Sequence, residues 1–406
     1  MDKPKHFTGQ PVFNQVLSLI PRSLIRGLCR RHSADRYCKK FKAYDHLVTM
    51  LFSALHQCTS LRELITGLQA SSGRLRHLGL THTPRRTTLA DANSRRCPAF
   101  FEDLYHELYR LHYGDLPDSL LKTRKQQRIF IADATTVSVF SAVMAGNGSF
   151  GLNGKKKGGA KAHVLMRASD NVPCFIRITP AIQNDRTFLP LIKIPAGSII
   201  IMDRGYNNYG QLMRWSRQKI TWVTRPDARA VYKIIHQKTI SDKHKQAGIM
   251  EDRIIELGNP KTAHLNAVQT VRMVVLYDKV TGKQYEFISN DLRSGPLTIA
   301  DLYKQRWQIE TMFKRIKQNF NLHNFLGDNE NAIRIQLWCT LIADLLIKII
   351  NDKVTKKRKW SMANLTGLIR LHLSTYINLK AFLLNPERAL LNYEDPFETQ
   401  LSMFKT

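Results

Sequence analysis

The run from Asp301 to Lys317 constrains this chain more than any other, because it contains no glycine or proline and reads as one amphipathic helix. Its apolar side chains recur at helical spacing and are predicted to form a buried stripe of Ile309, Met312, Phe313, Ile316 and Phe320. Four polar side chains, three, four and seven residues apart, are predicted to stack on one narrow strip, made of Tyr303, Arg306, Glu310 and Lys317.

This polar strip has two readings. A carboxylate can bind a metal ion, while two cations and a hydroxyl can grip phosphate oxygens, so the strip suits a phosphodiester. Alternatively, it is a solvated helix face with ordinary ion pairs at four-residue spacing. The helix alone does not decide between them, and the rest of the chain has to.

The charge of the chain favours a polyanion as partner. The 406 residues include 62 Lys and Arg against 32 Asp and Glu, which gives a formal net charge of +30. Nucleic acid is the first expectation for such a surface. A membrane-surface role is less favoured, because the basic residues are spread along the whole chain rather than held in one amphipathic helix.

Cysteine usage and hydropathy point to a cytoplasmic protein. The six cysteines are scattered without a C-x-x-C pair, which argues against a zinc module or a disulfide framework and for thiols in a reducing cytosol. The N-terminus lacks the apolar run of a signal peptide. The most apolar stretch, Ile335 to Ile350, is interrupted by Gln336, Asp344 and Lys348 and is expected to be a core helix.

The first part of the chain is predicted to be helical, from about Phe13 to Gly114. Basic residues crowd its first half, at Arg22, Arg26, Arg30, Arg31, Arg36, Lys39, Lys40 and Lys42. Residues 81–93 read as a polar, proline-marked entry into a helix, with Thr87 or Thr88 as N-cap. A plain helical bundle and a DNA-binding domain both fit; the basic first half favours DNA binding, over residues 1–118.

Strands are predicted beyond a polar linker at residues 120–127. The first, 128–139, carries Asp133 near its middle, and a Gly- and Lys-rich turn follows at 146–159. Further strands are expected at residues 161–167, 174–179, 198–203 and 219–224, with a helical crossover at 186–194. The run that ends in Asp203 is continuously apolar, as in a strand buried on both faces.

The later part alternates first as strands and then as helices. Residues of about 225–289 are predicted to be a β-rich insertion between the strand with Asp203 and the helix with Glu310. Helices are expected at 331–350 and 360–383. The fold class is therefore α/β: a catalytic core at 119–350 interrupted by this insertion, an all-α N-terminal domain, and a C-terminal helical region at 351–406.

Asp133, Asp203 and Glu310 are the candidate catalytic residues. A buried carboxylate is costly to ionise without a compensating cation. One such Asp would be read as a strand-end cap, but two of them, followed by a helical Glu between Arg and Lys, are more simply explained by a shared divalent cation. Oxygen-only ligands favour Mg²⁺, with Mn²⁺ able to substitute. Two ions about 4 Å apart could activate water or a 3′-hydroxyl and stabilise the leaving oxygen.

These residues resemble a known family. The contexts are Ile-Ala-Asp-Ala-Thr-Thr around Asp133 and Met-Asp-Arg-Gly-Tyr around Asp203, followed by the Tyr303/Arg306/Glu310/Lys317 spacing. Together they resemble the DDE transposases of bacterial insertion sequences, above all the branch with the Tyr-Arg-Glu-Lys signature, insertion sequence family four. The resemblance implies a ribonuclease-H-like core and cut-and-paste transposition, with cleavage at terminal inverted repeats and often a hairpin intermediate.

The resemblance also implies roles for single residues. Asp133, Asp203 and Glu310 would be the metal ligands, and Tyr303, Arg306 and Lys317 would hold DNA phosphates. Family features near His163 and Asp185 are incomplete, because the His of a frequent His-Asp pair is missing before Asp185, so both are read as structural. Some relatives stack an aromatic side chain on a flipped base, but Trp222 and Trp307 are expected to be core residues here.

Partners and alternatives follow from the same resemblance. It implies a homodimer that bridges two transposon ends, for which the helices from Trp360 onward are the candidate contact. Two other functions fit the residues: a hydrolytic DNA nuclease without strand transfer, and a non-enzymatic nucleic-acid-binding protein whose acidic residues are structural. Three such carboxylates argue against the pure binder.

Overall fold

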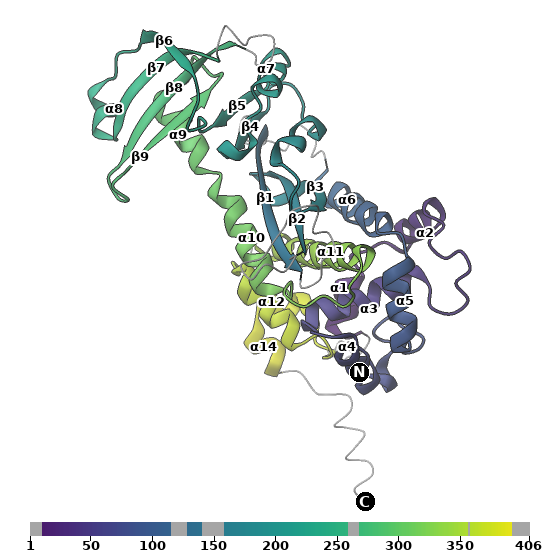
Figure 1. Ribbon diagram of the computed structural model, residues 1–406. Helices are drawn as coiled ribbons and strands as arrows, with labels where there is room; N and C mark the ends of the chain where they lie inside the picture. The colour runs from purple at the N-terminus through teal and green to yellow at the C-terminus, as the bar shows by residue number, and fades with distance from the viewer. Residues whose placement is uncertain (1–9, 115–127, 140–157, 259–267, 356–357, 392–406) are drawn as a thin grey trace, which may run out of the picture. The chain divides into compact units, whose positions relative to one another are not determined.

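The structure is a computed structural model that describes residues 10–114, 128–139, 158–258, 268–355 and 358–391 (Figure 1). By their contacts, the residues up to Gly114 and those from Lys314 onward form one compact unit, and the residues between them form a second. The predicted linker at 120–127 and most of the turn at 146–159 lie outside the described residues. The functional domain boundaries stay a prediction.

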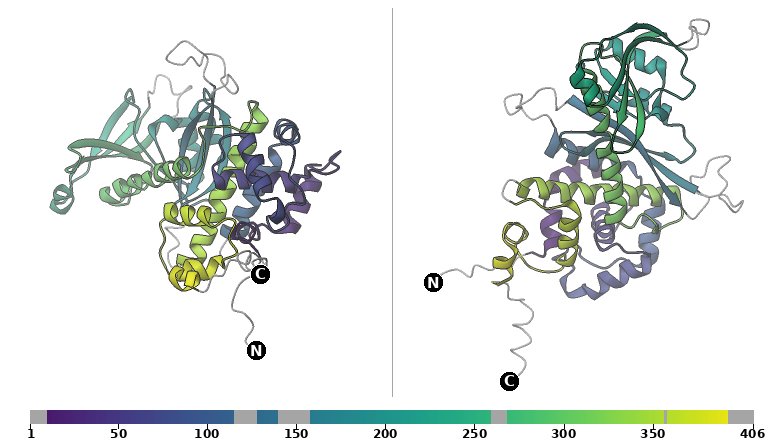
Figure 2. Two further views of the ribbon diagram at one scale, coloured as in Figure 1. Left: turned by 90° about the horizontal axis from the view of Figure 1, so that it is seen from below. Right: turned by 90° about the vertical axis from the view of Figure 1, so that its left-hand side faces the viewer.

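The first unit is helical. Its helices before the sheet are α1 (Val12–Leu17), α2 (Arg22–Arg31), α3 (Ala43–His56), α4 (Leu61–Ala70), α5 (Arg86–Arg95) and α6 (Ala99–Tyr113). Those after it are α11 (Glu330–Thr355), α12 (Met362–Leu371), α13 (Leu379–Leu384) and α14 (Pro386–Leu391). The long α11 packs against α3, α5, α6 and α12 and can be followed in two further views (Figure 2). Its buried apolar side chains confirm the core helix expected at 331–350.

Two details of this unit differ from the sequence prediction. Helix α5 begins at Arg86, with Arg85 at its N-cap position and no capping bond from that side chain, so the expected cap at Thr87 or Thr88 is wrong. Both threonines lie inside the first turn, because the backbone is already helical from Arg86, directly after the extended Arg85. The stretch 360–383 forms α12 and α13 rather than one helix.

The second unit is built on one mixed sheet. In the described residues it has nine strands, namely β1 (Ile129–Val139), β2 (Gly158–Arg167), β3 (Val172–Pro180), β4 (Ile199–Met202), β5 (Thr221–Thr224), β6 (Tyr232–Gln237), β7 (Ile249–Leu257), β8 (Gln269–Asp278) and β9 (Lys283–Ser289). Their order across the sheet is β3-β2-β1-β4-β5-β9-β8-β7-β6. The strands predicted around Asp133 and before Asp203 are therefore present as β1 and β4.

The first five strands have a ribonuclease-H-like arrangement. Strands β3, β2 and β1 form an antiparallel meander, and β4 and β5 then add to β1 in parallel. Helix α7 (Tyr209–Arg217) makes the crossover between β4 and β5. Strands β6 to β9, from the predicted β-rich stretch, continue the sheet because β9 pairs with β5. The predicted α/β class with a ribonuclease-H-like core is confirmed.

The crossover helix predicted at residues 186–194 is wrong. That stretch contains only two short 3₁₀ turns, η4 (Asp185–Thr187) and η5 (Leu189–Leu191). Pro190 lies in the second turn and cannot donate a helical hydrogen bond, and the Asn184 side chain closes the first turn by accepting from the amide of Arg186.

Apolar side chains fix the sheet. Met202, Trp215 and Trp222 are fully or almost fully buried in one cluster that also receives Phe188. The expectation that Trp222 belongs to the core is confirmed. No helix of the described residues is long and apolar enough to cross a bilayer.

A buried ion pair joins β7 to β8. Asp252 accepts two hydrogen bonds from Arg272, each 2.7 Å long, and their side chains are 3% and 1% exposed. Arg272 also donates to the carbonyl of Ser294.

Asp252→Ala should destabilise the protein by about 3–5 kcal/mol, because it leaves the Arg272 charge buried without its carboxylate. Asp242→Ala, which removes an exposed carboxylate of α8 (Asp242–Gln246), should change stability by less than about 0.5 kcal/mol. Urea unfolding of both variants checks this. Equal unfolding midpoints for the two would contradict the role given to the pair.

Candidate active site

Strand register brings Asp133 and Asp203 together. Parallel strands β1 and β4 pair up to Ala132 and Met202. Asp133 is the next residue of β1, and Asp203 directly follows the last residue of β4. Neighbouring strands lie about 4.8 Å apart, so the two carboxylates come from adjacent positions. They stand where β4 ends, and ligands of open α/β sheets bind at the carboxyl ends of the strands.

Tyr303 reaches the same place from helix α9 (Pro296–Lys304), which packs on β4, β5, β8 and β9. Its ring lies 4.8 Å from the ring of Phe287, and its hydroxyl donates to Oδ1 of Asp203 over 3.0 Å. Burial, reinforced by the Asp203 charge, raises the pKa of Tyr303. The phenol therefore stays neutral and acts as a hydrogen-bond donor.

The single helix predicted over 301–317 is wrong in one respect, because it is interrupted. Helix α9 ends at Lys304 and α10 (Trp307–Asn319) begins three residues later. The turn between them has three-residue hydrogen bonds, from the amide of Arg306 to Tyr303 and from the amide of Ile309 to Arg306. The predicted stripe on α10 is nevertheless buried, as expected.

Two neighbouring side chains at this turn point in different directions. Arg306 is 13% exposed and reaches the carboxylates. Trp307, the first residue of α10, is 61% exposed, so the expectation that it belongs to the core is wrong. The sequence carries no glycine or proline here that could have signalled the turn.

Arg306 bridges two of the three candidate carboxylates. Its Nη1 lies 3.2 Å from Oδ2 of Asp133, and its Nη2 lies 2.6 Å from Oε1 of Glu310. Burial works against the charged guanidinium, but Tyr303 and the carboxylates outweigh it and raise the pKa of Arg306. Its Nε is buried without a hydrogen-bond partner among the described residues.

The carboxylates act on one another electrostatically. Burial is the main cause that raises the pKa of Asp133 to about 6, and the charges of Asp203 and Glu310 add to it. The amide of Ala134, which donates to Oδ1 over 2.8 Å, and Arg306 work in the opposite direction. All three acids therefore lie within electrostatic reach of one site.

The donor types suit a hard divalent cation, but their arrangement is bridged by arginine. The site offers three carboxylates, the ligands that Mg²⁺ prefers, and two of them already share one cation, the Arg306 guanidinium. Among the residues that the structure describes, no group of three Asp, Glu, His or Cys side chains stands ready to hold a metal ion. Asp133 and Glu310 are thus held by Arg306, while Asp203 accepts from Tyr303.

Lys317 lies seven residues beyond Glu310 on α10, half-buried, and belongs by its contacts to the helical unit. Its predicted phosphate contact stays a prediction.

His163 and Asp185 lie in a neighbouring polar cluster. His163 is almost fully buried, its Nε2 lies 3.1 Å from Oγ1 of Thr179, and its ring stacks on Phe188. Burial lowers the pKa of His163 to about 4, so the ring is neutral at pH 7. Asp185 accepts from Nζ of Lys161 over 3.0 Å. The structural reading of both residues remains a prediction.

Sequence reasoning missed Tyr206, the last residue of the Asp-Arg-Gly-Tyr run. Its hydroxyl is buried and has no hydrogen-bond partner among the described residues. Burial raises the pKa of Tyr206, and the charges of Asp185, Asp133 and Asp203 raise it further. Its position three residues after Asp203 was the signal that could have found it.

Comparison with known proteins decides the family. The family described as "Transposase DDE domain" matches residues 124–346, which include all three acids, and a domain of unknown function (DUF4372) matches residues 8–81. This chain belongs to the DDE transposase family. As a member of this family it is an enzyme that acts on DNA, cleaving and joining strands with the help of a metal ion.

Named relatives of this DDE transposase are themselves described as transposases. "Putative transposase y4zB" of Sinorhizobium fredii is 31% identical over 268 residues, which are 66% of this chain and 72% of the relative. "Probable transposase for insertion sequence element IS5377" of Geobacillus stearothermophilus is 25% identical, over 57% of this chain and 59% of its own length. "Putative transposase for insertion sequence element IS4SA" of a Synechocystis strain is 22% identical, over 79% and 87%. The pure nuclease and the non-enzymatic binder are therefore not favoured.

One solved structure is similar at a lower level. It is described as a piggyBac transposase synaptic complex with hairpin DNA, and it shares 10% identity and a TM-score of 0.44 over 95% of this chain and 85% of that one. A likeness this weak adds nothing to the assignment.

Asp133→Asn should stabilise the transposase at pH 8 but not at pH 4. The folded-state pKa of about 6 lies above the ordinary value of 3.8, so the carboxyl is protonated in both folded and unfolded chains below about pH 4. The cost of ionising it in the fold appears as the pH rises and is complete above about pH 6. At about 1.4 kcal/mol per pH unit, the variant gains about 1–3 kcal/mol at pH 8.

Urea unfolding in EDTA at the two pH values measures this difference. Asp301→Asn, at an exposed carboxylate of α9, is the matched control and should show no such pH dependence. A gain for Asp133→Asn that is the same at pH 4 and pH 8 would contradict the cost assigned to the ionised carboxylate.

Proposed function

We propose that this transposase moves its element by a cut-and-paste reaction, cleaving DNA at terminal inverted repeats and joining the ends to a target. The observation that carries the proposal is the meeting of three carboxylates from distant parts of the chain: β1 places Asp133 beside Asp203, and Arg306 ties Asp133 to Glu310. The Tyr-Arg-Glu-Lys spacing supports membership of the branch formed by insertion sequence family four.

Asp133, Asp203 and Glu310 are the proposed metal ligands. When bound, two Mg²⁺ ions, or Mn²⁺ in their place, would polarise the scissile phosphate and lower the pKa of an attacking water or 3′-hydroxyl. The protein contributes three oxygen donors on a rigid sheet edge and helix. Burial of Asp133 limits the screening of its charge by bulk water, while the Glu310 side chain is 48% exposed.

Tyr303, Arg306 and Lys317 are the proposed phosphate contacts. The Tyr303 hydroxyl and the Arg306 fork already donate to carboxylates, which offer the same kind of anionic oxygen as a phosphodiester. A DNA phosphate that enters the site can take over the Arg306 donors and free Asp133 and Glu310 as ligands. DNA binding and completion of the ligand set are thereby linked through one side chain.

The active form is proposed to be a homodimer on double-stranded DNA, because joining two transposon ends in one event requires two active sites in register. The helices from Trp360 onward remain the candidate contact. The N-terminal helices are proposed as the DNA-binding domain, and the place of action is proposed to be the bacterial cytoplasm, at the nucleoid.

Replacing a proposed ligand should abolish cleavage without abolishing binding. Asp203→Asn removes one charge of the set and should lower cleavage of an inverted-repeat end in Mg²⁺ by at least about 10³-fold, since the metal loses an anionic ligand. Binding of the same DNA in a gel-shift assay should stay within about threefold.

Asp301→Asn is again the matched control, because Asp301 is an exposed carboxylate of α9 and is not one of the proposed ligands. Cleavage by Asp203→Asn at the control's rate would refute the assigned site. Cleavage of the wild-type protein without joining of the 3′-hydroxyl end to target DNA would instead favour a hydrolytic nuclease.

Arg306→Gln should affect metal binding and catalysis in opposite directions. Without DNA, loss of the guanidinium between Asp133 and Glu310 should strengthen Mn²⁺ binding by about tenfold, because a competing cation has gone. Cleavage should fall, because the phosphate loses a bidentate donor.

Calorimetric titration of the DNA-free protein with Mn²⁺ measures the first effect. Lys304→Gln, at the exposed end of α9, removes one positive charge without disturbing a described carboxylate contact of the site. An identical Mn²⁺ affinity for the two variants would mean that Arg306 does not compete with the metal.

A further inference from the structure

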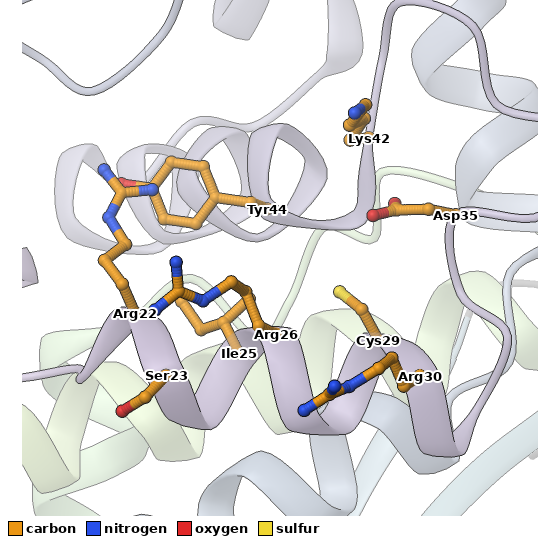
Figure 3. Close-up of a pocket in the computed structure, with 9 residues that line it drawn as sticks. All are labelled: Arg22, Ser23, Ile25, Arg26, Cys29, Arg30, Asp35, Lys42 and Tyr44. Atoms are coloured by element: carbon orange, nitrogen blue, oxygen red, sulfur yellow. The ribbon is translucent and has the colours of Figure 1, made fainter.

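A basic cavity of about 690 Å³ lies between α2 and the beginning of α3, inside the region that matches the domain of unknown function. It is lined by Arg22, Ser23, Ile25, Arg26, Cys29, Arg30, Asp35, Lys42 and Tyr44 (Figure 3). Four of these nine residues are cations and one is an acid. The function proposed for the carboxylates uses none of them.

The arginines on the two sides of α2 differ in whether they form ion pairs with acidic side chains. On one side, Arg31 pairs with Asp103 over 3.3 Å and with Glu107 over 3.7 Å, both on α6. Ile25 and Leu28 are buried beneath the helix. Arg31 thus links α2 to α6 through these ion pairs.

On the other side, three arginines are spaced by four residues, at Arg22, Arg26 and Arg30. All three are exposed, and none forms an ion pair with an acidic side chain in the described part of the chain. Four residues of helix rise by about 6 Å, so the row is about 12 Å long. A DNA duplex offers a phosphate about every 3.4 Å of axis on each strand, so such a row can meet several phosphates of one backbone.

Arg22 is held in position by Tyr44. The guanidinium carbon lies 3.6 Å from the centre of the Tyr44 ring, which leaves its N–H groups at the ring edge free to donate (Figure 3). Gly79 lies directly against the Tyr44 side chain. Its φ is +84°, and a Cβ atom added there would come within 2.9 Å of the Tyr44 hydroxyl oxygen. The stacked pair is therefore part of the folded structure, with little rotamer entropy left to lose on binding.

The one acid in the cavity is already engaged. Oδ1 of Asp35 accepts from the amide of Ala43 over 2.6 Å, at the beginning of α3. Burial, followed by the charge of Asp35 and a hydrogen bond to it, raises the pKa of Cys29 to about 11. Cys29 is therefore a neutral thiol, which argues against a nucleophilic or redox site in this cavity.

A second cavity of about 950 Å³ follows along the connection from α2 to α3 and is bounded by α5. It is also basic, but its cations are partly engaged: Arg95 pairs with Asp91 over 3.1 Å, and Arg96 donates to the carbonyl of Phe41. On α2, by contrast, none of the three arginines of the row has an acidic partner in the part of the chain that the structure describes.

We propose that Arg22, Arg26 and Arg30, with Lys42 opposite them, form a docking surface for the phosphate backbone of duplex DNA. This deepens the proposed function, on which it rests, by naming the surface with which the N-terminal region holds DNA. Its contacts are to phosphates, so it contributes affinity and orientation with little discrimination between sequences.

The test compares two triple variants of the full chain with the same change in charge. One combines Arg22→Gln, Arg26→Gln and Arg30→Gln. The control combines Arg62→Gln, Arg76→Gln and Lys380→Gln, which are exposed residues of the same unit outside both cavities. Fluorescence anisotropy with a labelled duplex, over a range of salt concentrations, gives affinity and salt dependence.

The α2 triple variant should bind the duplex at least about 30-fold more weakly than the wild type at 0.1 M salt. The slope of log K against log salt should fall by about 2–3, at about 0.9 per lost phosphate contact. The control should lose less than about threefold and keep its slope. Equal loss in the two triple variants would overturn the docking surface, as would an α2 variant that binds duplex normally but loses binding to anionic vesicles.

A double variant, Arg26→Gln with Arg30→Gln, covers the case in which loss of the Arg22–Tyr44 stack unfolds the triple variant. It keeps that stack, and neither of the two replaced side chains has a partner in the described fold. That double variant should lose at least about tenfold in affinity.

The two proposals can also fail separately. Wild-type protein that binds duplex but does not cleave it in Mg²⁺ contradicts the catalytic proposal, whereas a cleaving wild type with equal triple variants contradicts only the surface.

Discussion

One guanidinium holds the candidate active site together. Asp133 and Glu310 come from β1 and α10, 177 positions apart in the chain, and they meet through Arg306. Without a cation between them, two partly buried carboxylates would repel each other and raise the free energy of the fold. The planar fork of Arg306 contacts both at once, which the single ammonium of a lysine could not do with the same geometry. The fork extends from the turn between α9 and α10, where the amide of Arg306 donates to the carbonyl of Tyr303.

The second constraint is the register of β1 against β4. Pairing of Ala132 with Met202 makes Asp133 and Asp203 neighbours at the point where β4 ends. Because side chains alternate between the two faces of a strand, a slip of one residue would turn Asp133 to the opposite face of the sheet. The apolar cluster that contains Ile200, Met202 and Trp222 fixes this register, because the same slip would expose it. Core packing and site geometry are therefore determined by the same pairing.

The sequence predicted those parts of the structure that repeat with a period. The stripe of α10, the strands with Asp133 and Asp203, and the core helix at 331–350 all follow from regular spacing of apolar side chains, and they are present. The sequence prediction failed where the structure depends on a single turn. Nothing in Lys304-Gln305-Arg306 marks the break between α9 and α10. The outward direction of Trp307 could have been foreseen, because at about 3.6 residues per turn Trp307 lies opposite the apolar stripe. Pro190 was a visible signal against the helix expected at 186–194. The bridging role of Arg306 was out of reach, because it depends on contacts between elements far apart in the chain.

The structure also shows why the formal charge of +30 says little about affinity for DNA. Lysines and arginines that look equivalent in the sequence differ in what they must give up to reach a phosphate. Arg272 and Arg315 are held in buried pairs with Asp252 and Asp344, and a phosphate contact would break those pairs. In the proposed function, Arg306 exchanges a carboxylate for a phosphate, because both offer anionic oxygens to the guanidinium. The cations of α2 without acidic partners give up only water and counterions, and release of counterions is what drives binding to a polyanion. The salt dependence of DNA binding should therefore count such residues and not the total charge.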